Sequence, residues 1–185
     1  MMRLAFALAL FAAAGPARAS VVVPLDLSAL CEKAGLIVHG EVLKQESVWE
    51  KGRIVTRSVV KVLGALKGSA DREVVVRHMG GVVHGIGQKV YGETTLGVGE
   101  EVVLFLRPMG GEYRTVGMAQ GKFKVVVDPR SGARRAVQEL AGLEFLRVGG
   151  ATWPTPARSA DLPLADFFSR VTAEIARLRE SSAKP

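Results

Sequence analysis

Alternating apolar and polar residues dominate the middle of the chain and predict a mainly β protein. The strands expected from this alternation and from β-branched composition are 36–49, 53–63, 73–79, 100–107, 112–116, 122–127 and 133–137. The first two are long, and a short turn at 50–52 joins them. The apolar phase of the first strand changes at Gly40. Because a glycine inside a strand typically marks a bulge where a sheet curls, we predict a barrel.

One strand and two helices complete the expected core. Residues 102–106 are apolar on both faces, which predicts a central strand that a helix covers from outside. A short helix is expected at 26–34. At 164–180 an amphipathic helix is expected, and its apolar stripe is predicted to dock on the barrel, although a partner or a membrane surface would suit the same stripe. The stripe comprises Leu164, Phe167, Phe168, Val171, Ile175 and Leu178.

The first 19 residues have the three-part pattern of an export signal. Arg3 precedes an apolar run at 4–14 that is too short to span a bilayer, and a small-x-small site ends at Ala19. We therefore expect a signal peptide at 1–19, export to the periplasm or beyond the cell, and no transmembrane segment after the signal is removed. The remaining expected parts are a β-barrel domain at 20–148 with an extra β-hairpin at its end, a linker at 149–163, the helix at 164–180 and a tail at 181–185.

Charge and cysteine content narrow the class of protein further. Removing the signal takes away Arg3 and Arg18 and no acid, so the formal charge falls from +7 to +5. With so mild an excess and few aromatic residues, we expect no nucleic-acid partner. Cys31 is the only cysteine, which excludes an internal disulfide and favours a buried thiol over an intermolecular bond.

The most unusual segment is 80–99, which contains seven glycines in twenty residues. Glycine at this density lets a backbone turn tightly and approach another surface closely, so the segment is interpreted either as a binding lip or as a structural strap. A phosphate loop is not expected, since no Gly-Lys-Ser/Thr sequence opens a helix here. The candidate binding residues are Trp49, His78, Gly80, Gly81, His84, Gly85, Gly87 and Tyr91.

Catalytic motifs are scarce. His78 and His84, with Glu93 or His39 as a third ligand, form a candidate metal set. They lack the close paired spacing typical of zinc ligands, so ordinary surface or hydrogen-bonded histidines are the favoured interpretation. No Gly-x-Ser-x-Gly or His-Glu-x-x-His sequence is present. We therefore expect no catalytic residue, metal or cofactor.

Several motifs in order carry a family resemblance: 36–42 (LIVHGEV), 62–68 (VLGALKG), the 80–92 segment, 99–106 (GEEVVLFL) and 117–123 (GMAQGKF). Over about 27–127 the chain resembles a family of secreted bacterial proteins, a resemblance that implies no activity. More remotely, it is similar to the N-terminal domain of tissue inhibitors of metalloproteinases and to netrin-like modules. This second resemblance implies an OB-like five-stranded barrel. The inhibitors chelate zinc through an N-terminal cysteine, whereas the expected mature chain begins at Ser20, so their mechanism is not implied.

The functional hypothesis from sequence is an exported, non-enzymatic module that binds a protein or a cell-envelope component through segment 80–99. Two alternatives stay open at this point. One is a metal-assisted hydrolase that uses His78, His84 and Glu93, and the other is a structural envelope protein without a specific partner.

Overall fold

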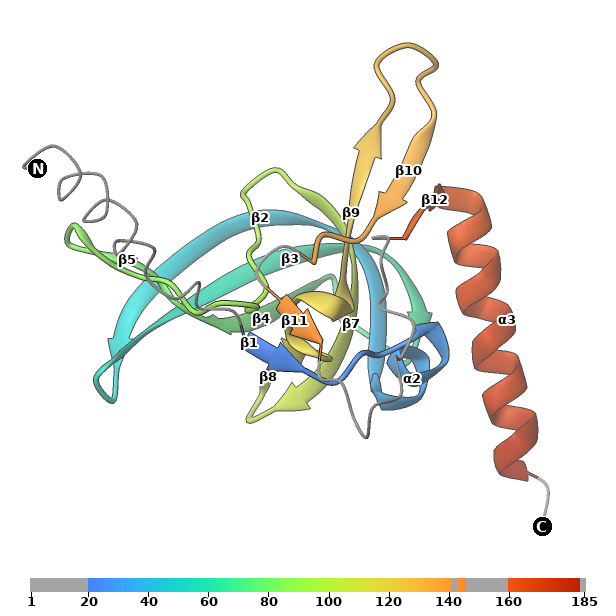
Figure 1. The fold of residues 1–185 in the computed structure, drawn as a ribbon, viewed down its shortest axis with the longest axis horizontal. Coiled ribbons are helices and arrows are strands. Elements are labelled where there is room, and N and C mark those ends of the chain that lie inside the picture. The colour runs from blue at the N-terminus through green and yellow to red at the C-terminus, as the bar shows by residue number, and fades with distance from the viewer. Residues whose placement is uncertain (1–19, 141–142, 146–159, 184–185) are drawn as a thin grey trace, which may run out of the picture.

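The computed structural model describes residues 20–140, 143–145 and 160–183, and its elements are mostly strands (Figure 1). Two helices, α2 and α3, and one short 3-10 turn, η2, accompany them. In chain order the elements are β1 (Ser20–Val22), α2 (Leu27–Lys33), β2 (Leu36–Glu50), β3 (Arg53–Lys67), β4 (Glu73–Met79), β5 (Gly81–Val83), β6 (Ile86–Gln88), β7 (Glu101–Met109), β8 (Glu112–Thr115), η2 (Met118–Gly121), β9 (Lys122–Val127), β10 (Arg134–Val137), β11 (Leu143–Phe145), β12 (Asp161–Pro163) and α3 (Leu164–Ala183).

Five strands form a closed ring in the order β7-β2-β3-β4-β8 and back to β7. Four of the contacts in the ring are antiparallel, and the fifth, between β4 and β8, is a parallel pairing of Val76 with Tyr113. Beyond β7 the sheet continues through β9, β10 and β12. The hairpin of β9 and β10 is the extra hairpin expected from the sequence, and it projects from the body of the protein (Figure 1).

The long strands β2 and β3 curl because their register shifts. Shifts occur at Ile37/Val38, at His39/Gly40 and between Val42 and Lys44, and the second confirms the irregularity predicted at Gly40. A Cβ atom at Gly40 would lie 2.5 Å from the Lys61 carbonyl oxygen, so only glycine allows the two backbones to approach this closely here.

Strand β7 separates two apolar cores. Leu104 and its neighbours on the same face pack inside the ring, whereas Val103 and Phe105 face outward and pack beneath the helices. Residues 102–106 are all fully buried, which confirms the prediction of a strand covered on both faces. The hydrophobic effect thus fixes the ring and the helical layer through the same strand.

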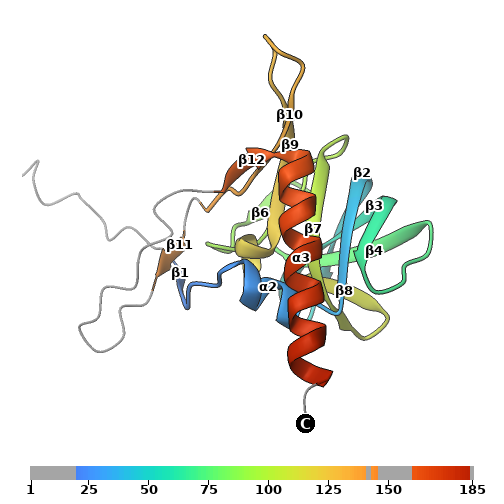
Figure 2. The same cartoon turned by 90° about the vertical axis from the view of Figure 1, so that its right-hand side faces the viewer.

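The two helices cover the outer face of the sheet (Figure 2). Helix α3 buries Leu164, Phe167, Val171 and Ile175, so its apolar stripe docks on the body of the protein. On α2, Cys31 is buried, as predicted, and desolvation raises the pKa of its thiol to about 11. The thiol therefore stays protonated at neutral pH.

Several sequence predictions fall partly or wholly outside the described residues. The signal peptide at 1–19 lies outside them, and so does most of the linker at 149–163, whose last three residues form β12. Helix α3 runs on to Ala183 and includes most of the predicted tail. No described helix is long and apolar enough to cross a membrane.

Candidate binding site

The glycine-rich segment folds over one end of the β2–β3 ribbon. After Gly80 the chain forms the β5–β6 hairpin, in which Val82 pairs with Gly87 and Val83 with Ile86. The hairpin is anchored at its base, where the side-chain oxygen of Gln88 accepts a hydrogen bond from the Ile54 backbone N–H at 2.6 Å. The segment therefore begins as an ordered hairpin, and residues 89–100 continue it without helix or strand.

Gly81 brings the hairpin into direct contact with the ribbon. A Cβ atom at this position would lie 2.5 Å from the Ser47 hydroxyl oxygen and would also collide with the Thr56 hydroxyl. The same two hydroxyls are hydrogen-bonded to each other at 2.8 Å, and Thr56 donates onward to the Gly80 carbonyl at 2.6 Å. The glycine and the two hydroxyls thus form one tight junction.

A cavity of about 800 Å³ lies between this segment and the ribbon. Ligand pockets in proteins commonly have volumes of about 300–1,000 Å³. One wall consists of segment 80–96, and the other consists of polar side chains of β2 and β3, namely Gln45, Ser47 and Thr56, together with His78 at the end of β4. The cavity continues the interior of the ring: along β4, the buried positions Val74, Val76 and His78 share one face.

His78 is held in its neutral form by its surroundings. Its Nε2 atom lies 3.2 Å from the Ser58 hydroxyl, which accepts a hydrogen bond from the Gln45 side-chain amide at 2.8 Å. Ser58 is therefore free to donate its own proton to an unprotonated Nε2. Burial lowers the pKa of His78 below its ordinary value; the nearby Glu93 carboxylate opposes this shift and Lys122 adds to it.

We expect this histidine to make stability depend on pH. Over the interval between its lowered folded pKa and the unfolded value of about 6.5, the unfolded chain binds a proton that the folded chain does not. Neutral His78 therefore makes its full contribution to the free energy of unfolding above about pH 6.5, and this contribution is lost as pH falls below that value. Urea unfolding at a series of pH values measures this effect. As pH is lowered below about 6.5, the free energy of unfolding should decline less steeply for His78→Gln than for the wild type.

The comparison isolates His78 because His39, whose pKa burial also lowers, is present in both proteins. Equal pH dependence in the two proteins would contradict the assignment.

Glu93 fixes the return of the glycine-rich segment. Its side chain is only 3% exposed, and its Oε2 atom accepts hydrogen bonds from Arg114 at 3.0 Å and from the Met79 backbone N–H at 3.3 Å. Its other oxygen accepts from the Thr94 N–H at 3.1 Å. Because both oxygens are engaged by the protein, Glu93 ties the segment to β4 and β8.

The hypothetical metal set is not assembled. His78 is buried at the cavity, whereas His84 is exposed at the turn between β5 and β6. Among residues 20–140, 143–145 and 160–183, no group of three His, Cys, Asp or Glu side chains is placed to hold a metal ion.

The structure brings five of the eight candidate residues to the cavity: His78, Gly80, Gly81, Gly87 and Tyr91. Above the Tyr91 ring, the Lys89 ammonium lies 5.2 Å from the centroid. The other three candidates lie away from the cavity wall. His84 and Gly85 form the hairpin turn, and Trp49 lies near the end of β2, two residues beyond Ser47 on the same strand face.

Sequence reasoning missed the polar wall of the cavity. Gln45 pairs with Ser58 and Ser47 with Thr56, at matched distances on either side of the turn at Lys51 and Gly52. Counting outward from that turn gives both pairs from the sequence alone, since a two-residue hairpin fixes its register. Two polar pairs on the inward face of an otherwise apolar ribbon would then have indicated the site.

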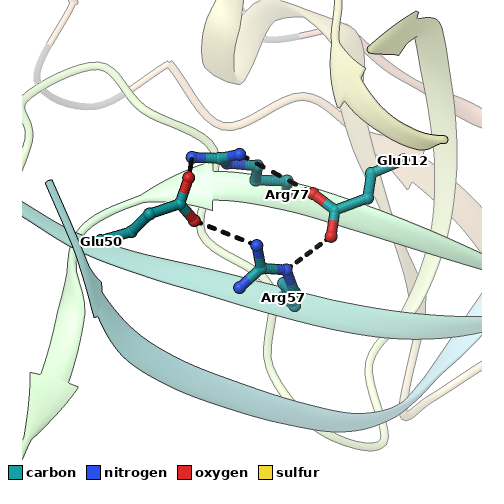
Figure 3. A network of polar contacts seen from close by, with 4 residues as sticks. All are labelled: Glu50, Arg57, Arg77 and Glu112. Atoms are coloured by element: carbon teal, nitrogen blue, oxygen red, sulfur yellow. Dashed lines mark hydrogen bonds and ion pairs between the residues drawn. The ribbon is translucent and has the colours of Figure 1, made fainter. Parts of the chain in front are cut away.

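The opposite face of the same strands carries a charged network (Figure 3). Arg57 and Arg77 are direct cross-strand neighbours, a pairing of like charges that is unfavourable by itself. Glu50 accepts from both, at 3.0 and 2.8 Å, and Glu112 accepts from Arg57 at 2.5 Å and lies 4.0 Å from Arg77. The Arg77 and Arg57 guanidinium groups hold the pKa of Glu50 below its ordinary value. The network links β2, β3, β4 and β8 beneath the cavity.

Comparison with known proteins identifies no family for this chain. No protein-family model matches it, and no curated protein matches it. The geometry of the cavity is therefore the basis for assigning a function.

Proposed function

We propose that the protein is an exported, non-enzymatic binding module, with an OB-like barrel as its body, that captures a protein or a cell-envelope component at the cavity beneath segment 80–96. The observation that carries this proposal is the cavity of about 800 Å³, in which an ordered glycine-rich hairpin faces polar side chains of the β2–β3 ribbon. The five-stranded ring, in the order β2-β3-β4-β8-β7, supports the OB-like architecture, since an OB fold is a small barrel of five strands.

The composition of the cavity favours binding over catalysis. The side-chain donors of Gln45, Ser47 and Thr56 are engaged within the protein, so these residues offer a ligand their neutral amide and hydroxyl oxygens as acceptors, and the backbone of the glycine-rich segment adds further polar groups. The two residues most suited to acid–base chemistry already have partners in the protein: His78 on β4 is hydrogen-bonded to Ser58 on β3, and Glu93 ties the segment to β4 and β8. Such a site suits a ligand recognised by hydrogen bonds and by contact with the Tyr91 ring.

Site-specific photo-crosslinking in the native cell envelope tests this proposal. A photoreactive amino acid replaces Tyr91 at the cavity in one protein and Val127 on β9 in a matched control, since both side chains are exposed. We expect a product of defined mass from position 91 and none of that mass from position 127. The same products from both positions, or no product from position 91, would overturn the proposal and favour a structural envelope protein.

A further inference from the structure

Two tight hairpin turns project at the same end of the molecule, at the left of Figure 1. One is the β2–β3 turn, where Lys51 and Gly52 have φ of 49° and 76°, and the other is the β5–β6 turn, where His84 and Gly85 have φ of 49° and 80°. Two successive positive φ angles are the pattern of type I′ turns, whose twist matches that of the flanking strands. Both tips are thus compact, and ordering them costs little on binding.

Each tip exposes large apolar side chains to solvent. Trp49, beside the first turn, is 49% exposed, and Val82 and Ile86, beside the second, are 64% and 57% exposed. Val82 and Ile86 lie on opposite faces of the β5–β6 hairpin, so a surface that receives the tip end-on contacts both side chains. Tryptophan is also the residue that favours the boundary between lipid headgroups and hydrocarbon, because its ring is apolar and its N–H is polar.

The charges around these side chains are positive. Lys51, Arg53 and Lys89 are exposed beside the two turns, and segment 80–92 contains no acidic residue. The nearest acid of the first turn, Glu50, is already paired with Arg57 and Arg77 on the charged network. An anionic surface would therefore be attracted to this end, whereas a cationic surface would be repelled.

We propose that these two tips, residues 48–54 and 82–89, dock on the surface of an anionic phospholipid bilayer. Trp49, Val82 and Ile86 enter the headgroup boundary, and the three cations contact the headgroups. Separate convex tips suit a deformable bilayer better than a folded protein face. Each cation near an anionic membrane contributes about fivefold in affinity, so three contribute roughly a hundredfold. The inference rests on the proposed function in one respect, export to the envelope, where such a surface is present.

Vesicle binding tests the inference with the purified exported protein carrying Trp153→Phe, which leaves Trp49 as its one tryptophan. The probes are vesicles of phosphatidylcholine alone and vesicles with about a third phosphatidylglycerol. We expect sedimentation with the anionic vesicles, a shift of Trp49 fluorescence to shorter wavelength, and binding roughly a hundredfold weaker to phosphatidylcholine alone. High salt should weaken the binding.

Matched variants locate the surface. Val82→Ser with Ile86→Ser removes apolar contact at one tip, and Val127→Ser with Leu63→Ser removes similar exposed side chains elsewhere. Lys51→Glu with Arg53→Glu reverses charge at the other tip, and Arg130→Glu with Arg179→Glu is its control. We expect at least tenfold weaker binding from each tip pair and little change from each control. Absence of binding to anionic vesicles, or equal losses from tip and control variants, would overturn the inference.

The two proposals fail in distinguishable ways. A crosslinked product at position 91 without vesicle binding would overturn only the membrane inference. Vesicle binding without any product at position 91 would overturn only the proposed use of the cavity.

Discussion

Phe167→Ala is expected to lower the free energy of unfolding by about 3–5 kcal/mol, a large fraction of the total for a single domain. The Phe167 side chain on α3 is 1% exposed, and its ring centroid lies 4.5 Å from that of Phe123 and 6.4 Å from that of Phe105. These rings join the helix to β7 and β9, so truncation removes apolar contacts with both strands and leaves a cavity between the layers. Urea unfolding and hydrogen exchange of α3 measure the effect.

The adjacent residue supplies a matched control. Phe168 is only partly buried and packs against the His39 ring at a centroid distance of 5.3 Å. Phe168→Ala should therefore cost markedly less, with about 0.5–1.5 kcal/mol from loss of the ring pair. Equal losses from the two variants, or unchanged protection of α3 in Phe167→Ala, would contradict docking of the helix through the Phe167 side of its stripe.

The sequence predicted those parts of the fold that local pattern determines. The apolar residues of α3 recur at helical spacing, and Leu164, Phe167, Val171 and Ile175 are indeed buried. Likewise, a run that is apolar at every position has to be covered on both faces, which is the situation of β7. The irregularity at Gly40 also followed from the sequence, because the apolar phase of the strand changes at this glycine; in the structure a Cβ atom there would strike the neighbouring backbone. In each case the residues of a single segment are sufficient to predict the feature.

Long-range pairings were beyond such reasoning. The ring closes through one parallel pairing between Val76 and Tyr113, and nothing in either segment specifies the other. The strand β12 was expected to be linker, because three residues that include Pro163 show no alternation. Its partner β10 confers the strand conformation. Pairings of this kind depend on where the intervening chain brings two edges together, which no local pattern records.

The candidate site was predicted in part for a similar reason. Glycine density drew attention to 80–99, part of which lines the cavity, but it did not reveal the β5–β6 hairpin, whose turn at His84 and Gly85 lacks the usual Asn-Gly or Asp-Gly sequence. The two histidines were considered together because they are close in sequence. In the structure His78 ends a strand and faces the cavity, whereas His84 lies at the exposed turn, so sequence proximity was a poor guide to spatial proximity.

Gly81→Ala is expected to detach the β5–β6 hairpin and to abolish the crosslinked product at position 91. An alanine at this residue carries two free-energy costs, one from the backbone conformation and one from steric collision. Its φ of +133° lies in a region that residues with a side chain rarely adopt, at a cost of about 1–3 kcal/mol, and the added methyl group collides with the Ser47 and Thr56 hydroxyls. Overpacking of this kind typically costs about 1–3 kcal/mol more. The hairpin can avoid both costs by leaving the ribbon, which would open the cavity on one side.

Gly85→Ala separates the two costs. Gly85 also has a positive φ, +80°, but a Cβ atom there would meet nothing within 4 Å, so this variant bears the conformational cost without the collision. We therefore expect hydrogen exchange of β5 and β6 to quicken strongly in Gly81→Ala and only modestly in Gly85→Ala. In both variants the free energy of global unfolding should change less than the free energy of local opening of the hairpin. Undocking the hairpin leaves the five-stranded ring and both apolar cores intact. Equal effects of the two variants would mean that contact with Ser47 and Thr56 does not hold the hairpin over the cavity.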